Sequence, residues 1–245
     1  MMIDDCFRFR SGELPKARTV VDINGQAISM KETDSDYARA LAAADVIHAD
    51  GQFIVWLSRI LPGRPIPERT ATTDLIHACA KAAEENGLRF YLLGATEDVS
   101  RRCAEELVRL YPGLDICGRR NGFFSESEED AVIADINASG ADIVWVGLGK
   151  PKEQIFTMRT RDRMRCGWIV TCGGCFNFIT GDYKRAPRWM QKAGLEWLHR
   201  MATGPTYLLK RYLLTIPHSL AVVFREDVLG HFRKRKKPDG EGADS

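Results

Sequence analysis

The strongest constraint on the fold is the alternation of short apolar runs with longer helical patterns between residues 19 and 176. The runs are continuously apolar, which is typical of strands that are buried on both faces of a parallel sheet. Helical spacing of apolar residues fills the intervals between them. The pattern predicts an α/β fold, a parallel sheet with helices on both faces. The expected strands are residues 19–23, 46–48, 89–93, 114–117, 143–146 and 168–171.

The segments outside this alternation differ in character. Residues 1–18 mix Arg, Asp and Gly with little periodicity, which predicts an irregular lead-in. The sheet-forming domain is expected over residues 19–200, followed by a helical basic and apolar appendage over 201–232. Residues 233–245 (RKRKKPDGEGADS) are polar and are expected to be a disordered tail. A length of 245 residues suits one large domain with such an appendage.

Charge and cysteine content bound the partners and the compartment. The net charge is +2, yet residues 200–245 hold nine Lys/Arg against five Asp/Glu. A nucleic-acid binder would spread its basic charge over a whole face, so no nucleic-acid partner is expected, whereas a basic terminal segment suits an anionic membrane surface. An odd number of scattered cysteines, seven, and no signal peptide favour a reducing cytoplasm. The CGGC sequence at Cys172 and Cys175 is interpreted as a turn after an apolar strand, because no second cysteine pair supports a zinc site.

Polar side chains follow the expected strands where these end. Asp22 and Asn24 close the first strand, and Asp50 follows the second. Ligands of open parallel sheets bind beyond the carboxyl ends of the strands, so these residues are candidates for a site. Asp50 could act as a general base on a hydroxyl, or could be an Asp-Gly turn residue or helix cap. Asp22 and Asn24 could bond sugar hydroxyls, or cap the next element.

Three glycines at two strand ends suit a diphosphate. Gly94, Gly147 and Gly149 allow close approach of a ligand, and each precedes an expected helix N-terminus. Lys152 adds either a mobile cation nearby or a solvated surface lysine. No GxGxxG sequence follows the first strand and no Walker lysine motif occurs, which weakens both a nicotinamide dehydrogenase and a P-loop interpretation.

Cations and aromatic residues interleave in the segment 181–200 (GDYKRAPRWMQKAGLEWLHR). It predicts either an amphipathic helix with its tryptophans inward or a cationic rim that holds a phosphate or diphosphate. Further on, an apolar stripe over 207–216 is flanked by Lys210 and Arg211. This stripe fits a helix in a membrane interface and a core-packing helix equally well. No apolar stretch reaches the length of a transmembrane helix.

The order NG, ADG, ERT, LLG, VGLGKPKEQ, CGGCFNFITG, KRAPRWMQKAGLEWLHR, KRY resembles the WecG/TagA/CpsF family of glycosyltransferases over about residues 19–212. The block from 185 to 200 is the most specific part. Within the family the chain is similar to the exopolysaccharide-assembly branch (GumM-like). The resemblance implies a Rossmann-like core, a membrane-associating appendage, and cytoplasmic placement as a peripheral protein on the inner face of the bacterial plasma membrane.

The resemblance also implies a reaction. It points to an inverting glycosyltransferase that moves a hexose-type sugar from a UDP or GDP nucleotide-sugar donor to a polyprenyl-diphosphate-linked saccharide in exopolysaccharide synthesis. The alternative within the family is an N-acetylmannosaminyl or N-acetylmannosaminuronyl transferase of the teichoic-acid or common-antigen type. A non-catalytic nucleotide-binding membrane scaffold is an alternative of another class. A homo-oligomer is compatible with the family.

Some site residues follow from this resemblance, and others, such as the glycines and Lys152, from the strand ends described above. Asp50 matches the catalytic base, and the cationic appendage would close over the acceptor diphosphate. No DxD-type metal motif stands in a suitable loop, so no metal or other cofactor is expected. The donor-binding candidates are Asp22, Asn24, Arg69, Thr70, Gly94, Gly147, Gly149, Lys152, Glu153 and Gln154. The acceptor-binding candidates are Arg185, Arg200, Lys210 and Arg211.

Four positions depart from the family pattern. PKEQ leaves open whether Glu153 or Gln154 faces the sugar. Asn177 stands where an aspartate is common, and Asp22 replaces a hydroxyl residue. The RTG-type turn reads Arg69-Thr70-Ala71 here, which bears on donor choice.

Overall fold

The computed structural model describes residues 1–60, 65–203 and 206–225. Its centre is a six-stranded, wholly parallel sheet in the order β2-β1-β6-β5-β3-β4. The predicted α/β class and the predicted strands are confirmed. The strands are β1 (Arg18–Ile23), β2 (Val46–Ala49), β3 (Arg89–Gly94), β4 (Asp115–Arg120), β5 (Ile143–Gly147) and β6 (Trp168–Thr171).

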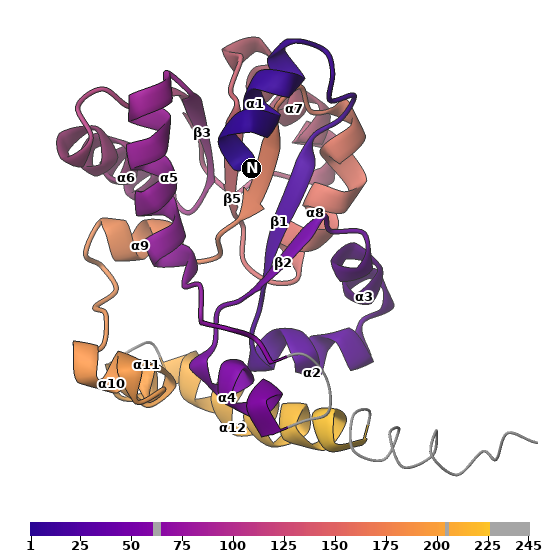
Figure 1. The fold of residues 1–245 in the computed structure, drawn as a ribbon, viewed down its shortest axis with the longest axis vertical. Coiled ribbons are helices and arrows are strands. Elements are labelled where there is room, and N and C mark those ends of the chain that lie inside the picture. The colour runs from indigo at the N-terminus through magenta and orange to yellow at the C-terminus, as the bar shows by residue number, and fades with distance from the viewer. Residues whose placement is uncertain (61–64, 204–205, 226–245) are drawn as a thin grey trace, which may run out of the picture.

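Helices connect the strands and cover both faces of the sheet (Figure 1). The α-helices are α1 (Met2–Arg10), α2 (Gly25–Thr33), α3 (Ser35–Ala42), α4 (Gln52–Ile60), α5 (Thr72–Asn86), α6 (Glu97–Leu110), α7 (Glu129–Ser139), α8 (Lys152–Thr160), α9 (Cys175–Ile179), α10 (Arg188–Lys192), α11 (Glu196–Thr203) and α12 (Thr206–Val223). The 3₁₀ turns are η1 (Glu126–Glu128) and η2 (Arg161–Arg163).

The core lies on the two faces of the sheet, because successive strand residues point to opposite sides. Phe90, Trp145 and Trp168 are fully buried in the cluster that also contains the apolar residues of α5 and α6. Tyr91 and Val144, which are next to Phe90 and Trp145 in the sequence, belong to a second cluster. This cluster contains the apolar residues of α7 and α8. Burial on both faces explains why the strand sequences are continuously apolar.

The N-terminal segment corrects one prediction. Residues 1–18 were expected to be irregular, but Met2–Arg10 form a helix. Cys6 is fully buried, and Arg10 donates hydrogen bonds of 2.7 and 2.6 Å to the Asp142 carboxylate. Asp5 accepts a 2.9 Å bond from Arg18 at the start of β1. The helix depends on these tertiary contacts, which local periodicity does not report.

The predicted helical appendage is present in the described residues. In Figure 1, α10, α11 and α12 lie together with α2 and α4 at the end of the molecule toward which the strands run. α12 packs against α2 and α11, and Ser29 of α2 bonds His218 of α12 at 2.7 Å. In the described parts of the chain, no helix combines the length and apolarity needed to cross a membrane. The expected tail over 233–245 and the appendage residues 226–232 lie outside the described residues.

Candidate active site

Two aspartates lie side by side where β1 and β2 end. Asp22 pairs in register with His48, and the backbone N–H of Asp50 donates to Ile23 O at 2.9 Å, continuing the ladder by one residue. The Asp50 side chain is 25% exposed, whereas that of Asp22 is only 5% exposed. Asp50 is therefore within reach of a ligand, and Asp22 forms the floor beside it.

The Asp22 carboxylate is neutralised by Lys150. The Lys150 ammonium, on the loop between β5 and α8, donates to Asp22 Oδ2, and its side chain is 9% exposed. Asn24 donates to the same oxygen at 3.3 Å while its own oxygen caps α2 at Ala27 N (3.1 Å). Asn24 thus both contacts Asp22 and caps the next helix. Although burial opposes the charged form, the Asp22 and Glu153 carboxylates raise the pKa of Lys150.

Lys150 is a site residue that the sequence analysis missed. The predicted cation, Lys152, lies instead on the outside: it donates to Gly122 O at 3.3 Å and stands over the Phe124 ring at 4.7 Å. Its position in the sequence could have indicated this role, because Lys150 is nearer than Lys152 to the end of β5. The structure does not bring Lys152 into contact with the aspartates.

Glu153 and Gln154 point to different places. Glu153 is fully buried, and its Oε2 accepts from the backbone N–H groups of Gly149 and Gly173, each at 3.0 Å. Gln154 donates to Glu153 at 3.0 Å and lines a cavity of about 10 Å³ with Thr157. Of the two, it is Glu153 that lies at the glycine turns.

Arg69 reaches Asp50 from the segment before α5. Thr70 N donates to Ala49 O at 2.9 Å, and His48 Nδ1 lies 2.9 Å from Thr70 O, so this segment runs beside β2. Arg69 Nη2 lies 4.0 Å from Asp50 Oδ1 and 2.6 Å from Glu196 Oε2, at the start of α11. Thr70 contributes its backbone to this arrangement. Glu196 was not among the predicted site residues.

The environment raises the pKa values of two carboxyl groups at the site, those of Asp50 and Glu153. Burial raises the pKa of Asp50 to about 7, with a further rise from the charge of Asp22, while Arg69 and Lys150 act in the opposite direction. Burial likewise raises the pKa of Glu153 to about 7, although the Lys150 charge lowers it. A carboxyl group whose pKa lies near neutrality suits proton transfer at that pH.

Two predicted glycines are packing positions. A Cβ on Gly94, whose φ is +148°, would lie 2.4 Å from Gly147 O, and one on Gly147 would lie 2.9 Å from Gly173 O. The ends of β3 and β5 and the turn after β6 therefore touch backbone to backbone. Gly149 (φ +78°) faces open space, so of the three it is the one free to meet a ligand.

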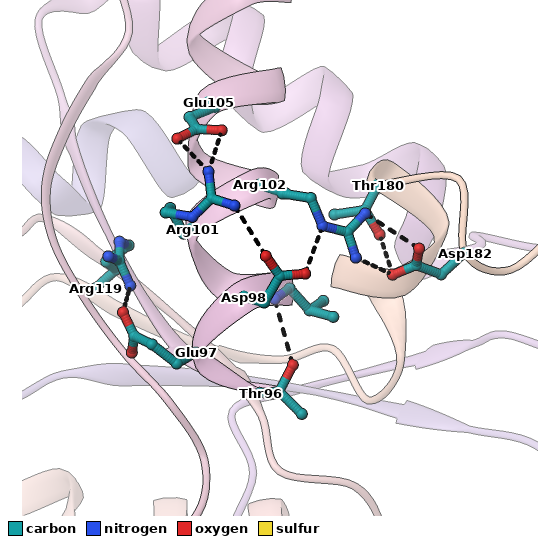
Figure 2. Close-up of polar contacts among 10 residues, drawn as sticks. Thr96, Glu97, Asp98, Arg101, Arg102, Glu105, Arg119, Thr180 and Asp182 are labelled. Atoms are coloured by element: carbon teal, nitrogen blue, oxygen red, sulfur yellow. Dashed lines mark hydrogen bonds and ion pairs between the residues drawn. The ribbon is translucent and has the colours of Figure 1, made fainter.

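The N-terminus of α6, which follows Gly94 in the sequence, already carries acidic side chains. Thr96 caps the helix at Val99 N (3.3 Å), and Glu97 and Asp98 fill the first turn (Figure 2). Since carboxylates already face the positive end of the helix dipole there, α6 is a poor place for a diphosphate.

A cavity of about 520 Å³ lies between the segment after α9 and the helices α11 and α12. Arg200 lines it, stacks over Phe178 at 5.2 Å, and acts electrostatically on Asp50. Asp182 in its wall is held by Arg102 of α6 through bonds of 3.1 and 2.7 Å (Figure 2). The remaining lining residues are Tyr183, Lys184, Thr203 and Leu208.

The other predicted acceptor cations are dispersed. Arg185 is paired with Asp74 and lies 3.9 Å from Glu196. Lys210 is exposed on α12, and Arg211 stands over the ring of Tyr212 at 4.8 Å. Arg200 is therefore the candidate acceptor cation that lines the cavity and also acts electrostatically on Asp50.

Comparison with known proteins identifies the class. Residues 7–233 match the family model described as "Glycosyl transferase WecG/TagA/CpsF family". The chain belongs to this family. It is also similar to N-acetylglucosaminyldiphosphoundecaprenol N-acetyl-beta-D-mannosaminyltransferase of Bacillus spizizenii, with 32% identity over 207 residues, which cover 84% of this chain and 76% of the relative.

Family membership makes this chain a glycosyltransferase, as the resemblance implied. Family membership therefore excludes the two alternative functions, a nicotinamide dehydrogenase and a non-catalytic membrane scaffold. The polar residues at the ends of β1 and β2 form the candidate active site of this glycosyltransferase.

Proposed function

We propose that this glycosyltransferase moves an N-acetylmannosaminyl-type sugar, with inversion, from a nucleotide-sugar donor to a polyprenyl-diphosphate-linked saccharide. The name of the Bacillus relative, which acts on N-acetylglucosaminyldiphosphoundecaprenol, supports this alternative over hexose transfer in exopolysaccharide synthesis. The observation that carries the chemistry is the accessible Asp50 carboxylate beside Arg69 and the Asp22–Lys150 pair.

Asp50 is the proposed base. It takes the proton of the acceptor hydroxyl, whose oxygen forms a bond to the anomeric carbon. The bond from that carbon to the donor diphosphate breaks, and the nucleoside diphosphate leaves with the electron pair. The cations beside Asp50 would stabilise the leaving diphosphate, with no metal required.

The cavity that borders Arg200 is the proposed acceptor site. Arg200 and Lys184 offer two cations for the acceptor diphosphate, and Phe178, Tyr183 and Leu208 offer apolar surface beside them. Arg185 would act indirectly, since Asp74 and Glu196 occupy its charge.

The function is tested with a panel of nucleotide sugars and a synthetic GlcNAc-diphosphate-polyprenol acceptor, with and without EDTA. We expect transfer from UDP-N-acetylmannosamine, detected as a heavier lipid-linked product by mass spectrometry, and we expect it to persist in EDTA. Transfer from UDP-glucose or GDP-mannose alone would favour the hexosyltransferase reading, and loss of transfer in EDTA would show a metal requirement.

The pH dependence of kcat/KM should report Asp50. A general base works deprotonated, so raising its pKa to about 7 moves the acid limb of the profile up to that pH. Activity should therefore rise with pH through about 7 and be ~100-fold lower at pH 5 than on the plateau. A limb that persists in Asp50→Asn would assign the titration to another group, such as Glu153.

Membrane association is proposed for the outer face of α12. Leu209, Leu213 and Leu220 are exposed at spacings of four and seven residues, which place them on one face. Leu213→Glu with Leu220→Glu should reduce co-sedimentation with phosphatidylglycerol vesicles by about tenfold or more, because apolar burial is lost and charge repulsion is added. Val108→Glu with Leu110→Glu, at two exposed apolar residues of α6, is the matched control. Equal sedimentation of all variants would contradict this orientation.

A further inference from the structure

Arg69 is shared unevenly between two carboxylates. Its Nη2 forms a 2.6 Å ion pair with Glu196 and stands 4.0 Å from Asp50. The side chains of Arg69 and Glu196 are only 14% and 16% exposed, so water screens these charges incompletely. Glu196 is also 3.9 Å from Arg185, which Asp74 holds from outside.

The distance between the Arg69 guanidinium and the Asp50 carboxylate affects whether Asp50 can act as a base. A guanidinium in hydrogen-bonding contact with a carboxylate stabilises its charged form and occupies the lone pairs that would accept a proton. At 4.0 Å, Arg69 attracts Asp50 without such a bond. The same guanidinium nitrogen lies 2.6 Å from Glu196, in the closer of its two ion pairs.

We propose that Glu196 is a positioning residue that holds Arg69 away from Asp50, so that the Asp50 carboxylate can accept a proton without a hydrogen bond from Arg69. The inference rests on the proposed role of Asp50. It links the segment after the sheet to proton transfer: Glu196 is the first residue of α11, and the Arg69 contact joins this helix to the loop beside β2.

The other charged groups around Asp50 come from several elements. Asp22 of β1 raises its pKa together with burial, whereas Lys150 and Arg200 lower it. Arg185 and the Cys175 thiol also interact with it electrostatically.

His48, on the strand that precedes Asp50, is bonded to Thr70 O, and burial lowers its pKa, so it stays neutral near pH 7. Lys150 is in turn bound to Asp22, and Arg200 is stacked on Phe178. Arg69 is thus the cation whose distance from Asp50 depends on Glu196.

Glu196→Gln tests the inference, because it removes the charge and keeps the shape. We expect Arg69 to turn to Asp50, the acid limb of kcat/KM to move down by about one pH unit, and the plateau kcat to fall about three- to tenfold, since a weaker base transfers the proton less readily. The donor KM should change little. Glu196→Asp, which restores the charge, should recover most of the plateau rate.

The matched control is Asp74→Asn, which removes a carboxylate from Arg185 but not from Arg69 and should leave the limb in place. In an Arg69→Met background, Glu196→Gln should no longer move the limb, because the mediating cation is gone. Circular dichroism and the melting temperature establish that each variant is folded.

A limb that stays in place in folded Glu196→Gln overturns the inference and leaves the proposed function intact. A shift that survives in the Arg69→Met background also overturns it, since Arg69 would not be the mediator. Failure of the proposed function has a different signature, namely wild-type turnover in Asp50→Asn.

Discussion

Asp50→Asn is expected to lower kcat by about 10²–10⁴, because that is the range that general-base assistance contributes. The amide keeps the size of the side chain and its place after β2, but cannot take the acceptor proton. Donor affinity should change little, since the loss falls on the chemical step. Single-turnover transfer to the lipid-linked acceptor, with nucleotide binding measured by calorimetry, checks both parts.

The matched control is Asp36→Asn. Asp36 is an exposed aspartate of α3, paired with Arg39. Its removal should leave turnover within about twofold of wild type, as is usual for surface positions. Turnover of Asp50→Asn within the same range would remove Asp50 from the mechanism, and a large loss of donor affinity would place it at the donor instead.

Lys150→Met should lower the free energy of unfolding by about 3–5 kcal/mol, the usual cost of leaving a buried carboxylate without its partner. Asp22 is 5% exposed and would lose its ion pair while keeping the 3.3 Å bond from Asn24. Urea unfolding followed by tryptophan fluorescence measures the change. The double variant Asp22→Leu with Lys150→Met should regain much of the loss, because no unpaired charge then remains.

Lys152→Met is the control for this experiment. Lys152 lies two residues further on but is on the outside, so its removal should cost less than about 0.5 kcal/mol. Equal losses in Lys150→Met and Lys152→Met would show that the Asp22–Lys150 pair does not stabilise the fold.

These two lysines also show how far sequence reasoning reaches. The parallel sheet was predictable because burial on both faces leaves continuous apolar runs, and the placement of Asp22 and Asp50 followed from the ends of those runs. The sequence could not predict which of the two lysines points into the site. Lys150 and Lys152 have the same chemistry and differ only in the direction in which the loop points them. That direction is set by the backbone between β5 and α8.

Ion pairs between residues far apart in the sequence could not be predicted either, because they too depend on how the backbone folds. Glu196 was quoted in a motif, but its partner Arg69 lies far away along the chain, and only the folded arrangement of α11 brings them together. The helix α1 was missed because Cys6 and Arg10 stabilise it through contacts with distant residues such as Asp142. In each case the energy comes from tertiary neighbours.

The close contact of the ends of β3 and β5 with the turn after β6 limits how this enzyme can change its substrate preference. Even one added methyl group at Gly94 or Gly147 would collide with backbone atoms of the next turn. New selectivity must therefore arise at the surrounding loops and at the helices beyond the sheet, where side chains have room to vary. Efforts to redirect the enzyme toward another sugar should begin at those loops and helices and leave Gly94 and Gly147 unchanged.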